Sequence, residues 1–194
     1  MTQPLQVVAP EELARGHFYG LLARLFYAPP DAALLEGIAR ESMQGDLAPA
    51  WGGLAQAAAT ADPEALRDEY DTAFVGTGKS PVTLYACAYT IRYSNEVPLV
   101  ELRSELAKLG LARRNEASEP EDHIAALCDT MRYLVAEQKQ DLADQKRFFA
   151  RWIGPTIDPL CSAIENSEQT AFYKHVARFA RSFLLLEQSA FEML

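Results

Sequence analysis

The chain has 194 residues, of which 49% are hydrophobic and 23% are charged, and its formal net charge is −9 at neutral pH. This length and composition favour one globular domain over residues 1–194 and argue against a disordered or fibrous chain. The acidic balance argues against nucleic acid as a partner, because binding to phosphate backbones requires a concentrated basic face.

Through the first half of the chain, apolar residues recur with a period of about 3.6 residues, which is typical of helices. The pattern predicts helices around residues 13–26, 34–38 and 66–74. Asp62 supplies an N-cap, and the proline and glutamate that follow it suit the first turn of a helix. A helix is therefore expected to begin at Pro63.

The second half of the chain shows the same spacing. It predicts helices around residues 102–109, 124–135 and 172–183. Pro98 is placed to open a helix, and Gly110 stands where the end of a helix favours a left-handed residue.

The stretch Trp152-Ile153-Gly154-Pro155 is expected to end one helix and begin the next. No run of alternating residues with hairpin turns stands out, so we expect an all-α, single-domain bundle of about eight or nine helices. No apolar stretch approaches the roughly 18 residues of a membrane span, and the N-terminus shows no export signal. A cytoplasmic protein is expected.

The one long irregular stretch runs from residue 74 to residue 90 and contains "GTGKS" at residues 76–80. Those residues suggest a phosphate-binding loop around Lys79. The full motif, however, requires a glycine at the position of Ala73 and a preceding strand, whereas a helical pattern precedes it here. A plain glycine-rich turn is favoured over a nucleotide site.

Aromatic residues follow this turn at intervals of four: Tyr85, Tyr89 and Tyr93. On a helix they would share one face, which is usually part of a core. A partly open aromatic face with polar tips would also suit a peptide-binding groove. The sequence leaves both interpretations open.

An acidic cluster that ends in Asp122-His123 precedes the apolar stripe "IAALCDTMRYL". Ser118 and Glu121 form a capping-box pattern, which favours a helix N-terminus here. Asp122 and His123 could also belong to a binding surface or act as an acid/base pair. Sequence neighbours point about 100° apart on a helix, so catalysis is the least favoured of the three.

Metal ligands and disulfides lack a recognisable pattern. The histidines are His17, His123 and His175, and the cysteines are Cys87, Cys128 and Cys161. No pair of them has the spacing of a zinc site, and an odd number of widely spaced cysteines fits reduced thiols in a cytosol. We therefore expect neither a metal nor a bound cofactor.

Three segments taken together resemble the TorD/DmsD family of cytosolic chaperones for molybdenum-containing reductases. They are "AFVGTGKSPVTLYACAY", "ELRSELAKLGL" and "SEPEDHIAALCDTMRYL", and the similarity is clearest over residues 66–135. Their order, their spacing and the Asp-His start of the last helix carry the resemblance.

The resemblance implies an all-helical protein that is not an enzyme. Such a chaperone binds the twin-arginine signal peptide, or the apo form, of a molybdenum oxidoreductase subunit until the cofactor is inserted, and export follows. The implied signal-peptide and client-binding residues are Phe74, Gly76, Gly78, Pro81, Tyr85, Tyr89, Glu119, Asp122 and His123. Cys87 stands where the family usually has a serine, so this chain has no serine hydroxyl there.

Two alternatives to this function stay open. A nitrate-reductase-type chaperone would escort a subunit that is not exported. A protein of a different class would be a small helical hydrolase, acting on nucleotides through Lys79 or using Asp122-His123. The resemblance also leaves open a homodimer that exchanges helices.

Overall fold

The computed structural model describes residues 10–76, 80–91, 97–113, 118–137 and 141–193. In the described part of the chain there is no β-strand, and the one isolated β-bridge joins Tyr85 to His123. The helices are α1 (Pro10–Tyr27), α2 (Ala32–Arg40), α3 (Ala48–Ala59), α4 (Pro63–Tyr70), α5 (Cys87–Thr90), α6 (Pro98–Lys108), α7 (Ile124–Arg132), α8 (Leu142–Phe148), α9 (Gly154–Asn166) and α10 (Phe172–Glu192).

The predicted all-α bundle of about eight or nine helices is confirmed, with α5 as an additional turn of 4 residues. π-helical turns directly continue α4, α7 and α8: η1 (Asp71–Val75), η2 (Tyr133–Glu137) and η3 (Phe149–Ile153). None of the described helices is long and apolar enough to cross a membrane.

Local capping rules account for several helix ends. The Asp62 carboxylate accepts the amide hydrogen of Glu64 at 3.2 Å, so α4 begins where the sequence predicts. Gly110, with φ +74°, ends α6. Its amide bonds the Ala107 carbonyl at 3.0 Å, and the next amide bonds the Leu106 carbonyl at 2.9 Å, which is a Schellman arrangement. The predicted roles of Asp62 and Gly110 are confirmed.

The boundary predicted at residues 152–155 has a different form from the one expected. Gly154 begins α9 and a proline follows it, but no loop separates α9 from α8. Instead η3 leads straight into α9, and the Gly154 amide reaches back to the Phe149 carbonyl. The π-helical turn lets helical backbone continue past a proline that has no amide hydrogen to donate.

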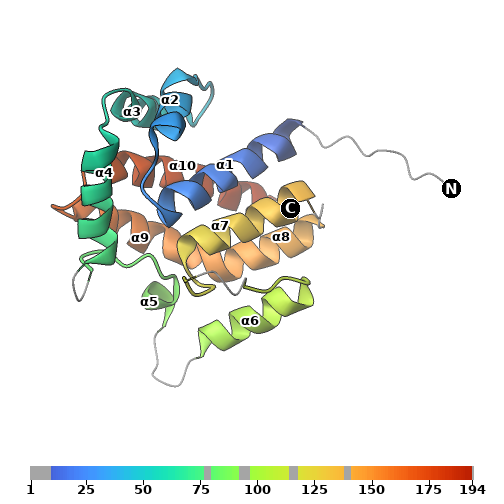
Figure 1. The fold of residues 1–194 in the computed structure, drawn as a ribbon. Coiled ribbons are helices and arrows are strands. Elements are labelled where there is room, and N and C mark those ends of the chain that lie inside the picture. Colours follow the sequence, from blue (N-terminus) through green and yellow to red (C-terminus); the bar gives the residue numbers. More distant parts are fainter. Residues whose placement is uncertain (1–9, 77–79, 92–96, 114–117, 138–140, 194) are drawn as a thin grey trace.

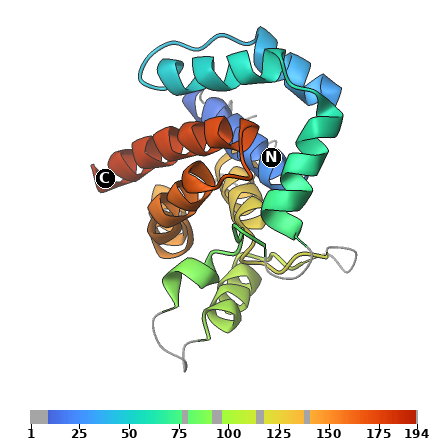
Figure 2. The same cartoon turned by 90° about the vertical axis from the view of Figure 1, so that its left-hand side faces the viewer.

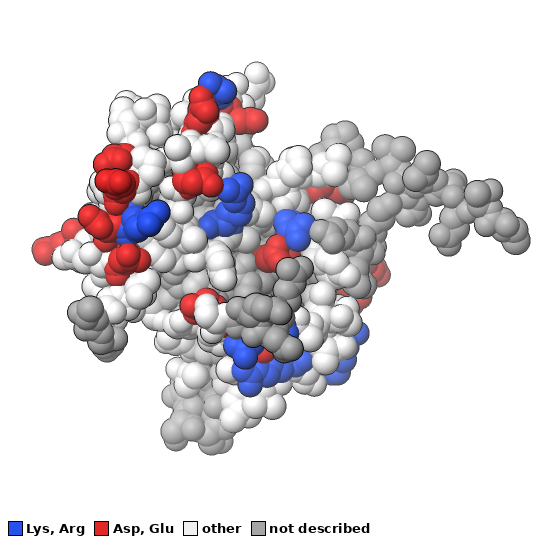
Figure 3. Space-filling view, in the orientation of Figure 1, with Lys and Arg blue, Asp and Glu red and all other residues white. Residues whose placement is uncertain are grey.

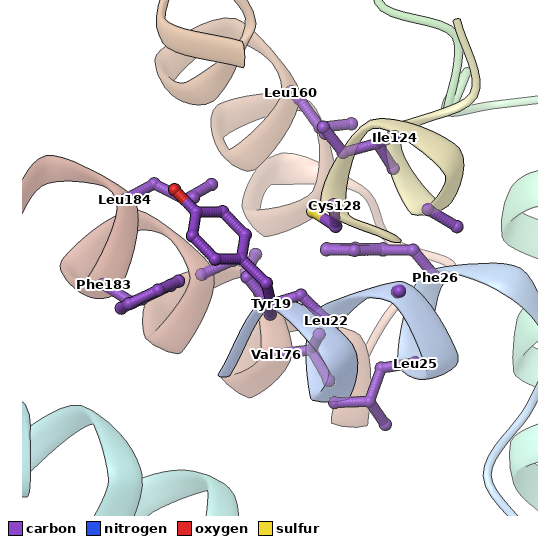
Figure 4. Close-up of a cluster of buried hydrophobic side chains, with 14 of the residues drawn as sticks. Tyr19, Leu22, Leu25, Phe26, Ile124, Cys128, Leu160, Val176, Phe183 and Leu184 are labelled. Carbon is purple, nitrogen blue, oxygen red and sulfur yellow. The ribbon is translucent and has the colours of Figure 1, made fainter. Parts of the chain in front are cut away.

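Helix α1 lies at the centre of the core. Figure 1 shows it beside α7 and in front of α10, and Figure 4 shows its side chains pointing into the space between them. Tyr19 and Leu22 of α1 are fully buried, as are Cys128 of α7 and Val176 of α10. Burying an apolar side chain of this size stabilises the fold by about 1.5–3 kcal/mol, so this contact contributes substantially to stability.

A buried ionic cluster ties the two ends of the chain together. The Glu187 carboxylate on α10 accepts hydrogen bonds from the Tyr19 hydroxyl at 2.9 Å and from the Arg15 guanidinium at 2.8 Å. Burial, followed by the charge of Glu187, raises the pKa of Tyr19 well above its usual value. Because both α1 residues depend on this one carboxylate, α1 is fixed in rotation against α10.

The start of α10 is capped by a residue from a distant helix. The Glu69 carboxylate on α4 accepts the amide hydrogens of Ala171 at 2.9 Å, Phe172 at 3.1 Å and Tyr173 at 2.9 Å. These are amides that the first turn of a helix leaves without partners. A negative charge there also suits the helix dipole.

Replacing this cap should destabilise the protein. We expect Glu69→Ala to lower the free energy of unfolding by about 1–2 kcal/mol, because α10 loses its N-terminal acceptor. Urea unfolding followed by circular dichroism measures the change. Asp68→Ala, which removes the exposed carboxylate next along α4, is the matched control and should change the free energy by less than about 0.5 kcal/mol. Equal losses in the two variants would contradict the capping role.

Candidate functional site

Two segments that are far apart in the sequence meet at the β-bridge between Tyr85 and His123. The Ala86 amide donates to the Asp122 carbonyl at 2.9 Å, and the Ile124 amide donates to the Leu84 carbonyl at 2.8 Å. The Tyr85 ring meets the imidazole edge to face, with 5.4 Å between centroids. The structure therefore brings together the two halves of the predicted site.

Asp122 is buried and serves as an anchor inside this junction. Its side chain is directed at Cys87, whose amide donates to the carboxylate at 3.3 Å. The Cys87 thiol is also hydrogen-bonded to Asp122; burial first, and then this bond, raise the pKa of the thiol to about 12. The thiol therefore stays protonated at neutral pH.

His123 caps helix α7. Its Nδ1 accepts the amide hydrogen of Ala125 at 3.2 Å, and the helix begins at Ile124. The predicted capping box of Ser118 and Glu121 is wrong, because a turn intervenes in which the His123 amide bonds the Pro120 carbonyl at 3.1 Å. The expectation of a cap near Asp122-His123 is right, but the imidazole itself provides it.

Two glutamates of the segment before α7 are held by partners on other segments. The Tyr85 hydroxyl donates to Glu119 at 2.6 Å, and this bond, then burial, raises the pKa of Tyr85 to about 12. Glu121 is bound by Arg103 of α6, whose Nε lies 3.0 Å from both carboxylate oxygens. Burial acts to raise the pKa of Glu121, but the hydrogen bond and charge of Arg103 outweigh it and lower the pKa overall.

A groove of about 1000 Å³ adjoins this junction, between α1, α7 and the residues that connect α6 to α7. We call it the α1–α7 groove. Its apolar lining includes Leu21, Ala23, Leu34, Leu106, Leu111 and Ala126. Its charged and histidine lining comprises His17, Arg24, Arg113, Glu119, Glu121, His123, Asp129 and Arg132.

Two glycines of α1 let this helix approach α7 and η2 closely. A Cβ atom at Gly16 would lie 3.0 Å from the Ala136 Cβ, and one at Gly20 would lie 3.0 Å from the Arg132 Cδ. Gly16 faces Ala136, whereas Gly20, further along α1, faces Arg132, which comes earlier in the chain than Ala136. The two helices are therefore antiparallel. The C-terminal part of α1 therefore faces the start of α7, where His123 lies.

The groove carries mixed charge. Figure 3 shows the face formed by α1 and α7, with basic and acidic side chains interspersed, while acidic side chains gather over α4. Within the groove, Asp129 pairs with Arg132 at 2.7 Å on α7. Glu119 and Glu121 lie just before α7, so the acidic groups other than Asp129 belong to the His123 end.

The predicted site residues divide into three groups. Glu119 and His123 line the α1–α7 groove. Tyr85 contacts both of these side chains, and Asp122 is the buried neighbour of His123 in the chain. Phe74 is buried against Tyr173, with 4.9 Å between ring centroids, so it belongs to the core.

The remaining predicted residues lie away from the groove or outside the described ranges. Gly76, with φ +59°, ends η1, and Pro81 is exposed. The Tyr89 hydroxyl donates to the Thr83 carbonyl at 2.8 Å. Because α5 begins at Cys87, Tyr85 precedes the helix and does not share a helix face with Tyr89. Gly78 and Tyr93 lie outside the described residues.

The sequence interpretation missed the contribution of α1. Gly16, Gly20 and Arg24 line the groove, and the spacing of the two glycines inside a helical pattern was the available signal. "GTGKS" has helical backbone rather than a strand before it, because η1 ends at Val75, and Lys79 lies outside the described residues. Among the described residues no cluster of three or more His, Cys, Asp or Glu is arranged to hold a metal ion.

Comparisons with known proteins identify a matching family and a similar fold. A sequence model of the nitrate reductase delta subunit family matches residues 40–184. The chaperone protein TorD of Photobacterium profundum is 34% identical over 76 residues, which are 38% of this chain and 35% of the relative. The match thus spans about a third of that relative's length.

A similar fold is known from a crystal structure. A protein of Archaeoglobus fulgidus described as a redox enzyme maturation protein superposes with a TM-score of 0.60 at 23% identity. The superposition covers 95% of this chain and 99% of the other. At this level of identity the likeness establishes the shared fold.

The His123 cap predicts a specific pH dependence of stability. Burial lowers the pKa of His123, although the charges of Glu119 and Asp122 oppose the shift. As the pH falls below about 6.5, the unfolded chain takes up a proton that the folded imidazole resists, so stability is lost in acid and is fully present above that pH. His123→Asn retains a capping side chain that does not titrate.

We therefore expect the wild type to lose more unfolding free energy than His123→Asn when urea titrations are moved from about pH 8 to about pH 5. His175, whose pKa is also lowered by burial, is present in both proteins and cancels in the comparison. Parallel pH profiles for the two proteins would show that His123 does not cap α7 as a neutral imidazole.

Proposed function

Because the chain belongs to the nitrate reductase delta subunit family, which agrees with its resemblance to the TorD/DmsD chaperones, we propose that it is a maturation chaperone of a molybdenum oxidoreductase. In this proposal it binds the twin-arginine signal peptide of the apo subunit and holds the subunit for cofactor insertion. The protein performs no reaction of its own on the client.

The observation that carries the proposal is the α1–α7 groove, which has apolar walls and places Glu119 and Glu121 at its His123 end, beside Arg113. A twin-arginine leader presents two guanidinium groups followed by an apolar segment. Carboxylates are the natural acceptors of guanidinium groups, and an apolar groove takes the segment that follows. Its volume of about 1000 Å³ is at the upper end of ordinary ligand sites.

The order of charges along the groove favours one direction of binding. Glu119 and Glu121 lie at the His123 end, so the arginines of the leader would bind there. The apolar segment would then run along α1, past Leu21 and Ala126, towards Arg132. Because a leader loses conformational entropy when it becomes ordered, the affinity stays low enough for release to the export machinery.

A second candidate function is favoured by the family description. The matching family is named for a nitrate reductase subunit, and a chaperone of that kind could escort a catalytic subunit that carries no leader. The same groove would then bind an apolar segment of the subunit. A client peptide with glutamines in place of the two arginines distinguishes the two functions, since only the leader-binding chaperone would discriminate against it.

Filling the groove should weaken peptide binding without unfolding the protein. Ala126 of α7 is half-buried and lines the groove. We expect Ala126→Phe to weaken the binding of a twin-arginine peptide by about tenfold or more in calorimetric titrations, because the ring occupies space that the peptide needs.

Ala65→Phe on the exposed face of α4 adds the same ring away from the groove and should leave the affinity unchanged. Circular dichroism confirms that both variants are folded. Wild-type affinity in Ala126→Phe would place the peptide site elsewhere.

A further inference from the structure

The chain supplies an arginine of its own to the acidic end of the groove. Arg103 of α6 places its Nε 3.0 Å from both oxygens of Glu121. The Glu121 side chain is 11% exposed, whereas the Arg103 side chain is 50% exposed. A nearly buried carboxylate is thus neutralised by a guanidinium group that reaches it from the solvent side.

Other acids of the groove are engaged differently. Glu119 accepts the Tyr85 hydroxyl, and Asp129 pairs with Arg132 one turn along the same helix. Glu121 is bound by the Nε of Arg103, a half-exposed side chain from another helix, and the charge of Arg113 also acts on it. Of these contacts, the one between Arg103 and Glu121 is the easiest to exchange for an identical group from outside.

We propose that Glu121 is the carboxylate that receives a guanidinium group of the client, and that Arg103 occupies it until the client displaces it. This inference rests on the proposed leader-binding function and names the residue that binds an arginine of the leader. Leaving a partly buried carboxylate unpaired costs free energy, so exchanging one guanidinium group for another is easier than opening an empty site. An apolar segment without a cation would leave Arg103 in place.

The exchange need not release α6. Leu102 and Leu106 bury this helix, and Glu105 accepts the Trp152 indole hydrogen at 2.7 Å. Arg151 also pairs with Glu101 at the other end of α6. Since these contacts hold α6 against η3, Arg103 can swing into solvent while Leu106 continues to line the groove.

Two substitutions that break the same ion pair test the proposal. Arg103→Met removes the internal occupant but retains an apolar stem, and should bind a synthetic twin-arginine peptide about two- to fivefold more tightly than the wild type. Glu121→Gln removes the acceptor and should bind it about tenfold more weakly. A purely structural ion pair would move both affinities in the same direction, because both variants lose the same contact.

Control variants distinguish the exchange of guanidinium groups at Glu121 from a general effect of charge on affinity. Arg178→Met removes an exposed arginine of α10 whose nearest acidic partner is Glu165 at 3.9 Å, and should leave the affinity unchanged. A peptide with two glutamines in place of the arginines should bind wild type and Glu121→Gln equally. Calorimetry gives the affinities, and thermal unfolding confirms that each variant is folded.

The outcomes separate this inference from the function on which it rests. If the wild type fails to bind the twin-arginine peptide, the leader-binding function and this inference both fall. If the wild type binds the peptide but Arg103→Met does not bind it more tightly, the groove keeps its function and the exchange at Glu121 is refuted. Opposite shifts in the two variants would establish it.

Discussion

The junction between the segment at residues 84–87 and the turn before α7 is the constraint on which the candidate site depends. Two backbone hydrogen bonds form the bridge. The buried Asp122 carboxylate strengthens it by accepting hydrogen bonds from the amide and the thiol of Cys87. Tyr85 then holds Glu119, and His123 starts the helix. Without this junction the acids before α7 would have no fixed position at the end of the groove.

Helix α1 joins the stability of the fold to the shape of the groove. Its inward face supplies Tyr19 and Leu22 to the core (Figure 4). Its rotation is set by the contact of Arg15 with Glu187. Its other face carries Gly16 and Gly20, where α7 and η2 approach. The other wall is formed by the start of α7 and by residues that follow α6, with Leu106 as the α6 residue in the lining. Helix α6 itself lies beneath the main bundle in Figure 1 and Figure 2.

Local signals in the sequence predicted the helices and several of their ends, because a 3.6-residue period, an Asp62 cap and a left-handed Gly110 act over a few residues. The site depends on contacts between distant segments, and there the sequence was less informative. The family resemblance implied a binding role for Phe74, which packs in the core, and the cap of α7 comes from His123 rather than from Ser118. The participation of α1 required knowing which helix packs against α7.

Hydrogen–deuterium exchange, with and without a twin-arginine peptide, shows which walls the peptide covers. We expect slower exchange on peptide binding in residues 16–27 of α1 and 119–130 around the start of α7, because the bound peptide reduces local opening of these two walls. Slower exchange confined to α4 and α10, with α1 and the start of α7 unchanged, would contradict it.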